Sequence, residues 1–101
     1  MFKSREELAL TEQAYQFHLY LLGQPGAGEL DMIENLQKSL ARTYGGACTL
    51  ELRDIFDARH AQEAVKDQVF SVPSLVRTNP APVRMAIGSL EDAAELVLQL
   101  Q

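Results

Sequence analysis

The sequence predicts an α/β domain in which helices cover both faces of a four-stranded mixed sheet, in the element order β-α-β-α-β-β-α. Residues 15–55 read as a strongly apolar strand, a glycine-rich turn, an amphipathic helix and a second strand. Residues 74–87 hold two short apolar runs separated by prolines, which is typical of a hairpin. A capped helix with a regular apolar stripe then closes the chain. The early β-α-β unit implies parallel strands with a right-handed crossover, and the hairpin adds an antiparallel pair.

The first strand is expected over Tyr15–Leu22, where apolar residues occupy both alternating sets. Such a strand is covered on both faces and is therefore central in its sheet. The turn Gly23–Gly28 ends it, and Gly45-Gly46 ends the helix that follows over residues 29–44. The apolar side of this helix is predicted to carry Leu30, Ile33, Leu36, Gln37, Leu40 and Tyr44.

The second strand, Cys48–Ile55, alternates between apolar and polar residues. This pattern indicates a half-buried strand whose outward charges suit an exposed sheet edge. The residues expected to point inward are Cys48, Leu50 and Leu52, and those expected to point outward are Thr49, Glu51 and Arg53.

The second half of the chain begins with a short helix over residues 58–66. Pro73 then opens the third strand at Ser74–Val76, because a proline fits best at a strand's first residue. The segment Asn79–Pro82 leads to a fourth strand, Val83–Ile87. Ser89 is predicted to cap a final helix over residues 89–100, whose apolar stripe is Leu90, Ala93, Leu96, Val97 and Leu100.

Size and composition limit the classes of protein. The 101 residues suffice for one domain, expected over residues 15–101 behind a polar leader at 1–14. No apolar run approaches the roughly 20 residues of a membrane helix, and the leader has no signal-peptide core, so we expect a cytoplasmic protein. With 14 acidic and 9 basic residues, a net charge of −5 and no Lys/Arg cluster, nucleic acid is an improbable partner.

Redox and cofactor chemistry are not expected. A redox turn needs a thiol at the helix N-terminus, but the turn Gly23–Gly28 has neither Cys nor Ser, and the lone Cys48 is predicted to face inward. The turn also lacks the order of a phosphate loop or dinucleotide site, so we interpret it as a simple connection.

Titratable residues offer little support for catalysis or metal binding. His18 and His60 have no ligand partners at metal-site spacing, and His18 is expected to be half-buried with its hydrogen bonds satisfied. Asp54 and Asp57 have the composition of an acid–base pair, but strand ends and helix caps collect Asp for local reasons. We therefore predict no catalytic residue and a protein that is not an enzyme.

Two arginines mark the hairpin. Arg77 and Arg84 belong to its two arms and are expected to lie near each other. Two interpretations stand side by side: an interface for an acidic partner, since Arg is enriched in interfaces, and a solvated hairpin face.

From Tyr15 onward the pattern resembles the KaiB family of bacterial clock proteins. The family reads L-Y-V-A-G-x-T-P after its first strand, where this chain has Leu19–Pro25, and V-I-D-V at its second, where this chain has Leu52–Ile55. Its most distinctive stretch, I-x-A-T-P-T-L-x-x-x-x-P-x-P-x-R-x-I-I-G-D-L, is matched by residues 69–75 and then by Pro80, Pro82, Arg84, Ile87, Gly88 and Leu90, with Ser89 in place of the aspartate.

The resemblance implies a thioredoxin-like fold with a cis Val72-Pro73 bond and a non-enzymatic regulator without cofactor. It implies docking on the ATPase ring of a KaiC-like protein, capture of a KaiA-like protein on the second-strand edge, and competition with a KaiB-like domain of a histidine kinase. Asp31 and Glu51 stand where relatives are often basic, so we expect weak binding to the KaiC-like ring.

The resemblance also implies an alternative ground-state packing, in which the C-terminal half is rearranged and the protein is a tetramer. The strong helix formers of residues 90–100 favour the thioredoxin-like packing and a monomer in dilute solution. Two other functions remain open. One is an accessory partner of a histidine kinase without KaiC, and the other is a glutathione-binding module suggested by Val72-Pro73-Ser74-Leu75.

A partner is expected to dock through two groups of residues taken together. These are the second-strand edge with Glu51, Arg53 and Asp54, and the hairpin face with Arg77 and Arg84. An exposed edge supplies unpaired N–H and C=O groups for strand addition, and the charges supply steering and register.

Overall fold

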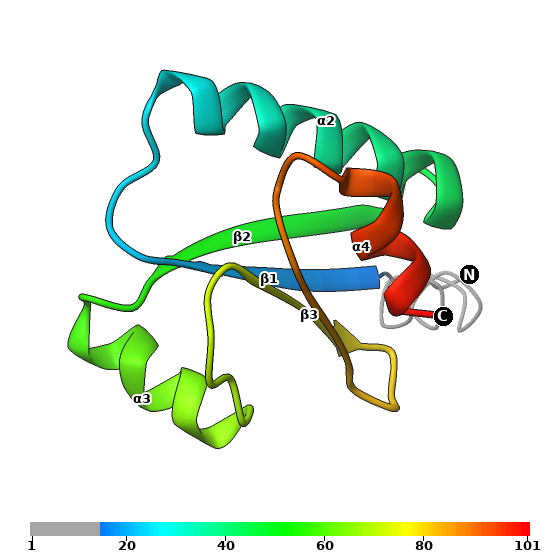
Figure 1. The fold of residues 1–101 in the computed structure, drawn as a ribbon. Coiled ribbons are helices and arrows are strands. Elements are labelled where there is room, and N and C mark those ends of the chain that lie inside the picture. Colours follow the sequence, from blue (N-terminus) through cyan, green and yellow to red (C-terminus); the bar gives the residue numbers. More distant parts are fainter. Residues whose placement is uncertain (1–14) are drawn as a thin grey trace, which may run out of the picture.

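The computed structural model describes residues 15–101, so the leader predicted for residues 1–14 lies outside it. Along the described residues the element order is the predicted β-α-β-α-β-β-α (Figure 1). The elements are β1 (Tyr15–Leu21), α2 (Ala27–Tyr44), β2 (Cys48–Asp54), α3 (Ala58–Lys66), β3 (Ser74–Asn79), β4 (Arg84–Ile87) and α4 (Ala93–Gln99).

The strands of residues 15–101 form one four-stranded sheet in the order β2-β1-β3-β4. β1 runs parallel to β2 and antiparallel to β3, which pairs antiparallel with β4. The central position predicted for the first strand and the edge position predicted for the second are both confirmed.

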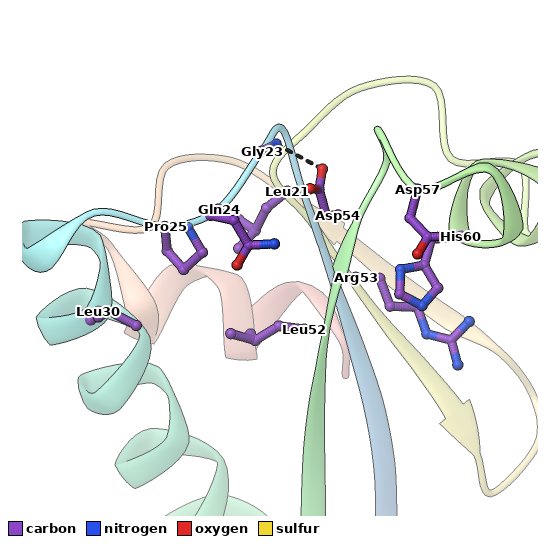
Figure 2. A pocket seen from close by; sticks show the side chains of 10 residues that line it. All are labelled: Leu21, Gly23, Gln24, Pro25, Leu30, Leu52, Arg53, Asp54, Asp57 and His60. Carbon is purple, nitrogen blue, oxygen red and sulfur yellow. Dashed lines mark hydrogen bonds between the residues drawn. The ribbon is translucent and has the colours of Figure 1, made fainter.

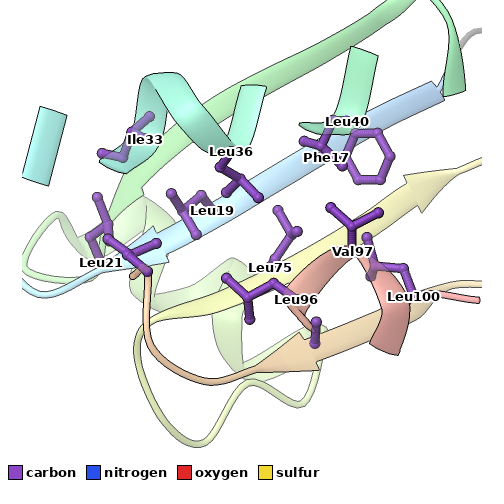
Figure 3. Close-up of a cluster of buried hydrophobic side chains, with 12 residues drawn as sticks. Phe17, Leu19, Leu21, Ile33, Leu36, Leu40, Leu75, Leu96, Val97 and Leu100 are labelled. Atoms are coloured by element: carbon purple, nitrogen blue, oxygen red, sulfur yellow. The ribbon is translucent and has the colours of Figure 1, made fainter. Parts of the chain in front are cut away.

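One face of the sheet is covered by α2 and α4, which pack against each other and against the inner strands (Figures 1 and 3). Spacings of three and four residues place Ile33, Leu36 and Leu40 on one side of α2, where all three are buried. The buried side chains that they join are Phe17, Leu19, Leu21, Leu75, Ala86, Leu90, Leu96, Val97 and Leu100.

The opposite face is covered by α3, around a smaller core of Tyr20, Ala64 and Val76. The Tyr20 hydroxyl donates a hydrogen bond of 3.0 Å to the Asp67 carboxylate, just beyond the end of α3. Burial and this carboxylate raise the pKa of Tyr20 to about 12. The helices on both faces thus bury β1 from both sides, as predicted.

Two leucines expected in the core are exposed. Leu22 lies beyond the end of β1, because the chain leaves the sheet at Gly23, and its exposed fraction is 61%. Leu30 belongs to the first turn of α2, which extends past the core, and its exposed fraction is 50%. Both lie near the end of the sheet at which β1 and β2 finish.

The final helix begins later than predicted. It starts at Ala93, and its N-cap is Asp92, whose carboxylate accepts from the Glu95 N–H at 3.1 Å. The Ser89 hydroxyl instead accepts from the Glu91 N–H in the turn before the helix. Ser89 is used in this turn, so the aspartate three residues on caps the helix.

The connection into β3 has the expected cis Val72-Pro73 bond, and the bonds before Pro80 and Pro82 are cis as well. The buried Ser74 hydroxyl donates to the Ser71 carbonyl at the start of β3. A helix over residues 93–99 identifies the thioredoxin-like packing rather than the alternative one.

The outer edge of β4 is covered by a side chain of α4. The Ile87 N–H donates to Gln99 Oε1 at 3.0 Å, and Gln99 Nε2 donates to the Ile87 carbonyl at 3.0 Å. The amide of Gln99 thus occupies the place of a neighbouring strand residue.

We predict that Gln99→Ala lowers the free energy of unfolding by about 1 kcal/mol, since two exposed hydrogen bonds are lost. Gln99→Glu retains the acceptor but not the donor, so its free energy of unfolding should lie between those of Gln99→Ala and the unmodified protein. Urea unfolding measures the difference, and Gln62→Ala at an exposed position of α3 is the control. Equal stability of Gln99→Ala and the unmodified protein would show that the amide does not stabilise the edge.

Candidate functional site

The outer edge of β2 presents backbone groups that no other strand of residues 15–101 pairs with. At the two ends of the β1–β2 pair, the Tyr15 N–H donates to the Ala47 carbonyl at 3.1 Å and the Ile55 N–H to the Leu21 carbonyl at 2.9 Å. In a parallel ladder, every second residue of a strand hydrogen-bonds the neighbouring strand through its backbone N–H and C=O groups. In β2 these residues are Thr49, Glu51 and Arg53, whose backbone groups point toward β1. The N–H and C=O groups of Leu50 and Leu52 therefore point away from the sheet, where no strand of residues 15–101 pairs with them.

The side chains of this edge divide between the two faces of the sheet. Figure 2 shows Leu52 on the α2 side of β2 and Arg53 on the α3 side. Leu52 points toward α2 as expected, but it is not buried: its exposed fraction is 37%. It lines a pocket of about 380 Å³ with Leu30 and Pro25, at the end of the sheet where β1 and β2 finish.

On the α3 side, Arg53 is tied to two carboxylates. Its guanidinium donates to Glu51 Oε1, with Nε at 3.2 Å and Nη2 at 2.7 Å, and its Nη1 donates to Glu63 of α3. Arg53 points away from the main core, as predicted, but its side chain is not in solvent. The helix α3 covers that face of the sheet and leaves only 11% of the side chain exposed. Glu51 is 57% exposed and forms the accessible charge of the edge.

His18 extends this network across β1. Its Nε2 lies 3.3 Å from Glu51 Oε1, whereas its buried Nδ1 has no hydrogen-bond partner among residues 15–101. The prediction of a satisfied side chain is thus wrong for one of its two nitrogens. Burial and the nearby Arg53 charge lower the pKa of His18, and the hydrogen bond from Arg53 lowers the pKa of Glu51.

The two aspartates after β2 have local structural roles. Asp54 Oδ1 accepts from the N–H groups of Gly23 and Phe56, each at 2.9 Å, and so joins the turns that follow β1 and β2. Gly23 has a φ of +81°, which favours glycine. Asp57 is the N-cap of α3, where it accepts from the Arg59 N–H at 2.9 Å. The structural interpretation of this pair is confirmed.

The hairpin arginines Arg77 and Arg84 are directly opposite each other in the β3–β4 register. The prediction that they lie near each other is confirmed. Arg77 Nη2 donates to the Pro82 carbonyl at 3.0 Å, and its Cζ lies 5.9 Å from the centre of the Tyr15 ring. Arg84 is exposed. Because β1 and β3 separate β4 from β2, the structure does not bring this pair together with Glu51, Arg53 and Asp54.

Apolar exposure near the pocket is the feature that sequence reasoning missed. Leu22 and Phe56, 61% and 73% exposed, flank the turns that Asp54 joins, and Leu30 and Leu52 line the pocket. Three of these residues, Leu22, Leu30 and Leu52, were predicted to be buried because they are apolar. Their positions after the last strand residue and in the first turn of a helix were the available signal.

Other chemistry finds little support in residues 15–101. Cys48 packs against the main core, and burial raises the pKa of its thiol. No three His, Cys, Asp or Glu side chains of this region gather as they would around a metal ion. Its helices also include none with the length and apolar character needed to cross a bilayer.

These features define a thioredoxin-like domain without a thiol in the turn after β1, and with an open sheet edge at β2. The KaiB domain family model matches residues 18–101, and the chain belongs to the KaiB family. The circadian clock oscillator protein KaiB of Microcystis aeruginosa is 25% identical over 93 residues, covering 92% of this chain and 86% of the relative. KaiB1 of Synechocystis is 28% identical over 91 residues, covering 88% and 82%.

Solved structures agree on the fold. The N-terminal domain of SasA from Synechococcus elongatus superimposes with a TM-score of 0.61 at 17% identity, covering 87% of this chain and 80% of that domain. Thioredoxin O1 from Arabidopsis thaliana gives a TM-score of 0.57 at 18% identity, covering 97% and 93%. The thioredoxin-like fold is therefore confirmed.

The position of His18 predicts a pH-dependent stability. Its folded pKa lies below 6.5, so in mildly acidic solution the unfolded chain binds more protons than the folded one. Neutral His18 therefore contributes to the stability of the fold at a pH above 6.5, and this contribution is lost as the pH falls through the folded pKa. We expect His18→Gln to reduce the difference in unfolding free energy between about pH 7.5 and about pH 5.5. An unchanged difference, measured by urea unfolding at both pH values, would contradict this assignment.

Asp54 is expected to stabilise the fold by joining two turns. Asp54→Ala leaves the Gly23 and Phe56 N–H groups without their acceptor and should lower the free energy of unfolding by about 1–2 kcal/mol. Asp54→Asn retains an acceptor oxygen and should lose less than half as much. Thermal unfolding of the two variants checks the order, and an asparagine variant as unstable as the alanine variant would refute it.

Proposed function

We propose that this protein is a non-enzymatic regulator that acts by protein–protein interaction in a circadian or related signalling system. The observation that carries the proposal is the open edge of β2, where Leu50 and Leu52 direct backbone donors and acceptors away from the sheet. Membership of the KaiB family and relatives named as circadian clock oscillator proteins support it. The described residues supply no reactive thiol and no metal cluster for an enzymatic alternative.

The edge can receive a strand of a partner protein. In strand addition the main-chain hydrogen bonds supply affinity, and pockets for alternate side chains supply specificity. On one face an added strand would meet Leu52 and the pocket beside it, and on the other it would meet the exposed carboxylate of Glu51. The family resemblance implies a KaiA-like protein as the partner of this edge, and we propose it as the occupant.

A KaiC-like ATPase ring is the second proposed partner, and we expect its binding to be weak. Asp31 is exposed on α2, and the side chain of Glu51 is 57% exposed. The family resemblance implies basic residues at these two positions in relatives. A ring surface complementary to basic side chains would be repelled by these two acids. A histidine kinase is the alternative partner if the ring does not bind. A pull-down from the native host separates the two.

Leu50→Pro tests the edge directly. The Leu50 N–H points away from β1, so proline removes a group available to a partner but no hydrogen bond of the β1–β2 ladder. We expect about a tenfold loss of affinity for the captured partner, equivalent to one hydrogen bond. Leu50→Ala is the matched control, because it shortens the side chain and keeps the N–H. Calorimetry measures both, and equal affinities for the two variants would exclude strand addition at this position.

Arg84→Glu tests the hairpin as a separate surface. Arg84 is exposed, so charge reversal should leave the fold intact. If an acidic partner surface contacts the hairpin, association should slow, and the effect should be larger at low ionic strength. Lys38→Glu on α2 is the control with the same change in net charge. Identical association rates for the two variants in stopped-flow measurements would leave Arg84 as part of a solvated hairpin face.

A further inference from the structure

We propose that the open edge of β2 also pairs with β2 of a second copy of this chain, antiparallel about a two-fold axis at Leu52. In this arrangement Glu51 of each copy lies directly opposite Arg53 of the other. The two four-stranded sheets of the described residues would join into one continuous sheet.

The two edge strands differ in whether their outward backbone groups are hydrogen-bonded, and this difference selects β2. At β4, the Gln99 amide occupies both backbone groups of Ile87 at 3.0 Å. At β2, within residues 15–101, no side chain or strand is bonded to the outward groups of Leu50 and Leu52. Unpaired strand edges are the usual template for pairing with another chain, so self-association is expected at β2.

The register follows from the charges. Only residues with outward backbone groups exchange hydrogen bonds, which pairs even-numbered residues with even-numbered ones. Centring the pair on Glu51 places Glu51 opposite its own copy, which is unfavourable for like charges. Centring it on Leu50 places Glu51 opposite Thr49 and leaves the charges unmatched. Centring it on Leu52 places Glu51 opposite Arg53 twice, so this register alone is self-complementary.

The side chains near the axis favour the same register. Leu52 and Leu30, 37% and 50% exposed, lie on the α2 side of the edge, so pairing about Leu52 removes apolar surface from water. On the α3 side, Arg53 uses three of its five N–H groups on Glu51 and Glu63. The Tyr20 hydroxyl is a further hydrogen-bond partner of Arg53. The contact between the copies is therefore made by the Glu51 carboxylate, whose side chain is 57% exposed, toward the Arg53 guanidinium of the second copy.

The dimer is expected to be weak. Each copy carries a formal net charge of −5, which opposes association at long range. A single pair of short strands also buries little surface compared with stable interfaces. The protein should therefore be monomeric in dilute solution and dimerise as its concentration rises. Because the same edge serves in the proposed strand addition, dimerisation would compete with capture of a partner protein.

Disulfide trapping tests the register. In a Cys48→Ser background, Leu52→Cys places two thiols on the axis, at a Cα separation of about 5.5 Å for a hydrogen-bonded pair, which a disulfide can bridge. Leu50→Cys lies two residues from the axis and should not bridge to its own copy. Leu98→Cys, at a position 61% exposed on α4, measures random collision.

We expect covalent dimer from Leu52→Cys at least about tenfold faster than from Leu50→Cys or Leu98→Cys, since only its thiols are within bonding range. Faster crosslinking of Leu50→Cys would overturn the register. Equal rates for all three variants would overturn the dimer itself.

Charge exchange gives an independent test on the full chain. Glu51→Arg and Arg53→Glu should each abolish the concentration-dependent mass increase in analytical ultracentrifugation, because like charges then face each other. Mixing the two variants restores both opposite-charge pairs and should restore the dimer. Glu34→Arg, exposed on α2, is the control for net charge. Loss of the dimer in the mixture, with both variants folded by circular dichroism, would refute the proposal.

Discussion

The burial of β1 on both faces is the constraint on which the rest of the structure depends. Its odd-numbered side chains require α2 and α4 on one side, and Tyr20 requires α3 on the other. A strand buried in this way must also satisfy its backbone from both sides, so β2 and β3 flank it. Once β1 is central, β2 becomes an edge, and no strand of residues 15–101 pairs with its outward backbone groups.

The two edges of the sheet are unequal because the side chains around them differ. α4 ends beside β4, and Gln99 there reaches the backbone of Ile87. α3 is joined to β2 by the ion pair of Glu63 with Arg53, a contact between side chains that leaves the outward backbone groups of Leu50 and Leu52 without a partner among residues 15–101. The ion pair holds the edge strand against α3 without covering its outer backbone groups, and for this reason we propose β2 as the interaction surface.

Sequence reasoning succeeded where a local pattern and the tertiary structure agree. The strand pairing was predictable from apolar periodicity, and the thioredoxin-like packing from the helical period of the last segment together with the family pattern. The cis Val72-Pro73 bond was predictable from the family pattern alone. It failed where a neighbour decides the outcome. Arg53 was expected in solvent, but α3 covers it, and Leu30 and Leu52 were expected in the core, but they line an open pocket. Which residues an edge leaves exposed depends on the ends of distant helices, which periodicity does not encode.

Residue-resolved amide hydrogen exchange along β2, measured for the protein alone at low concentration and with its captured partner in excess, tests the central claim most directly. The account predicts fast exchange at Leu50 and Leu52 and slow exchange at Thr49, Glu51 and Arg53 in the free protein, because only the latter bond β1. Binding of the partner should slow amide exchange at Leu50 and Leu52 to the rates of the neighbouring residues. Exchange at these two amides that stays fast in the complex would contradict the assignment of the β2 edge as the interaction site.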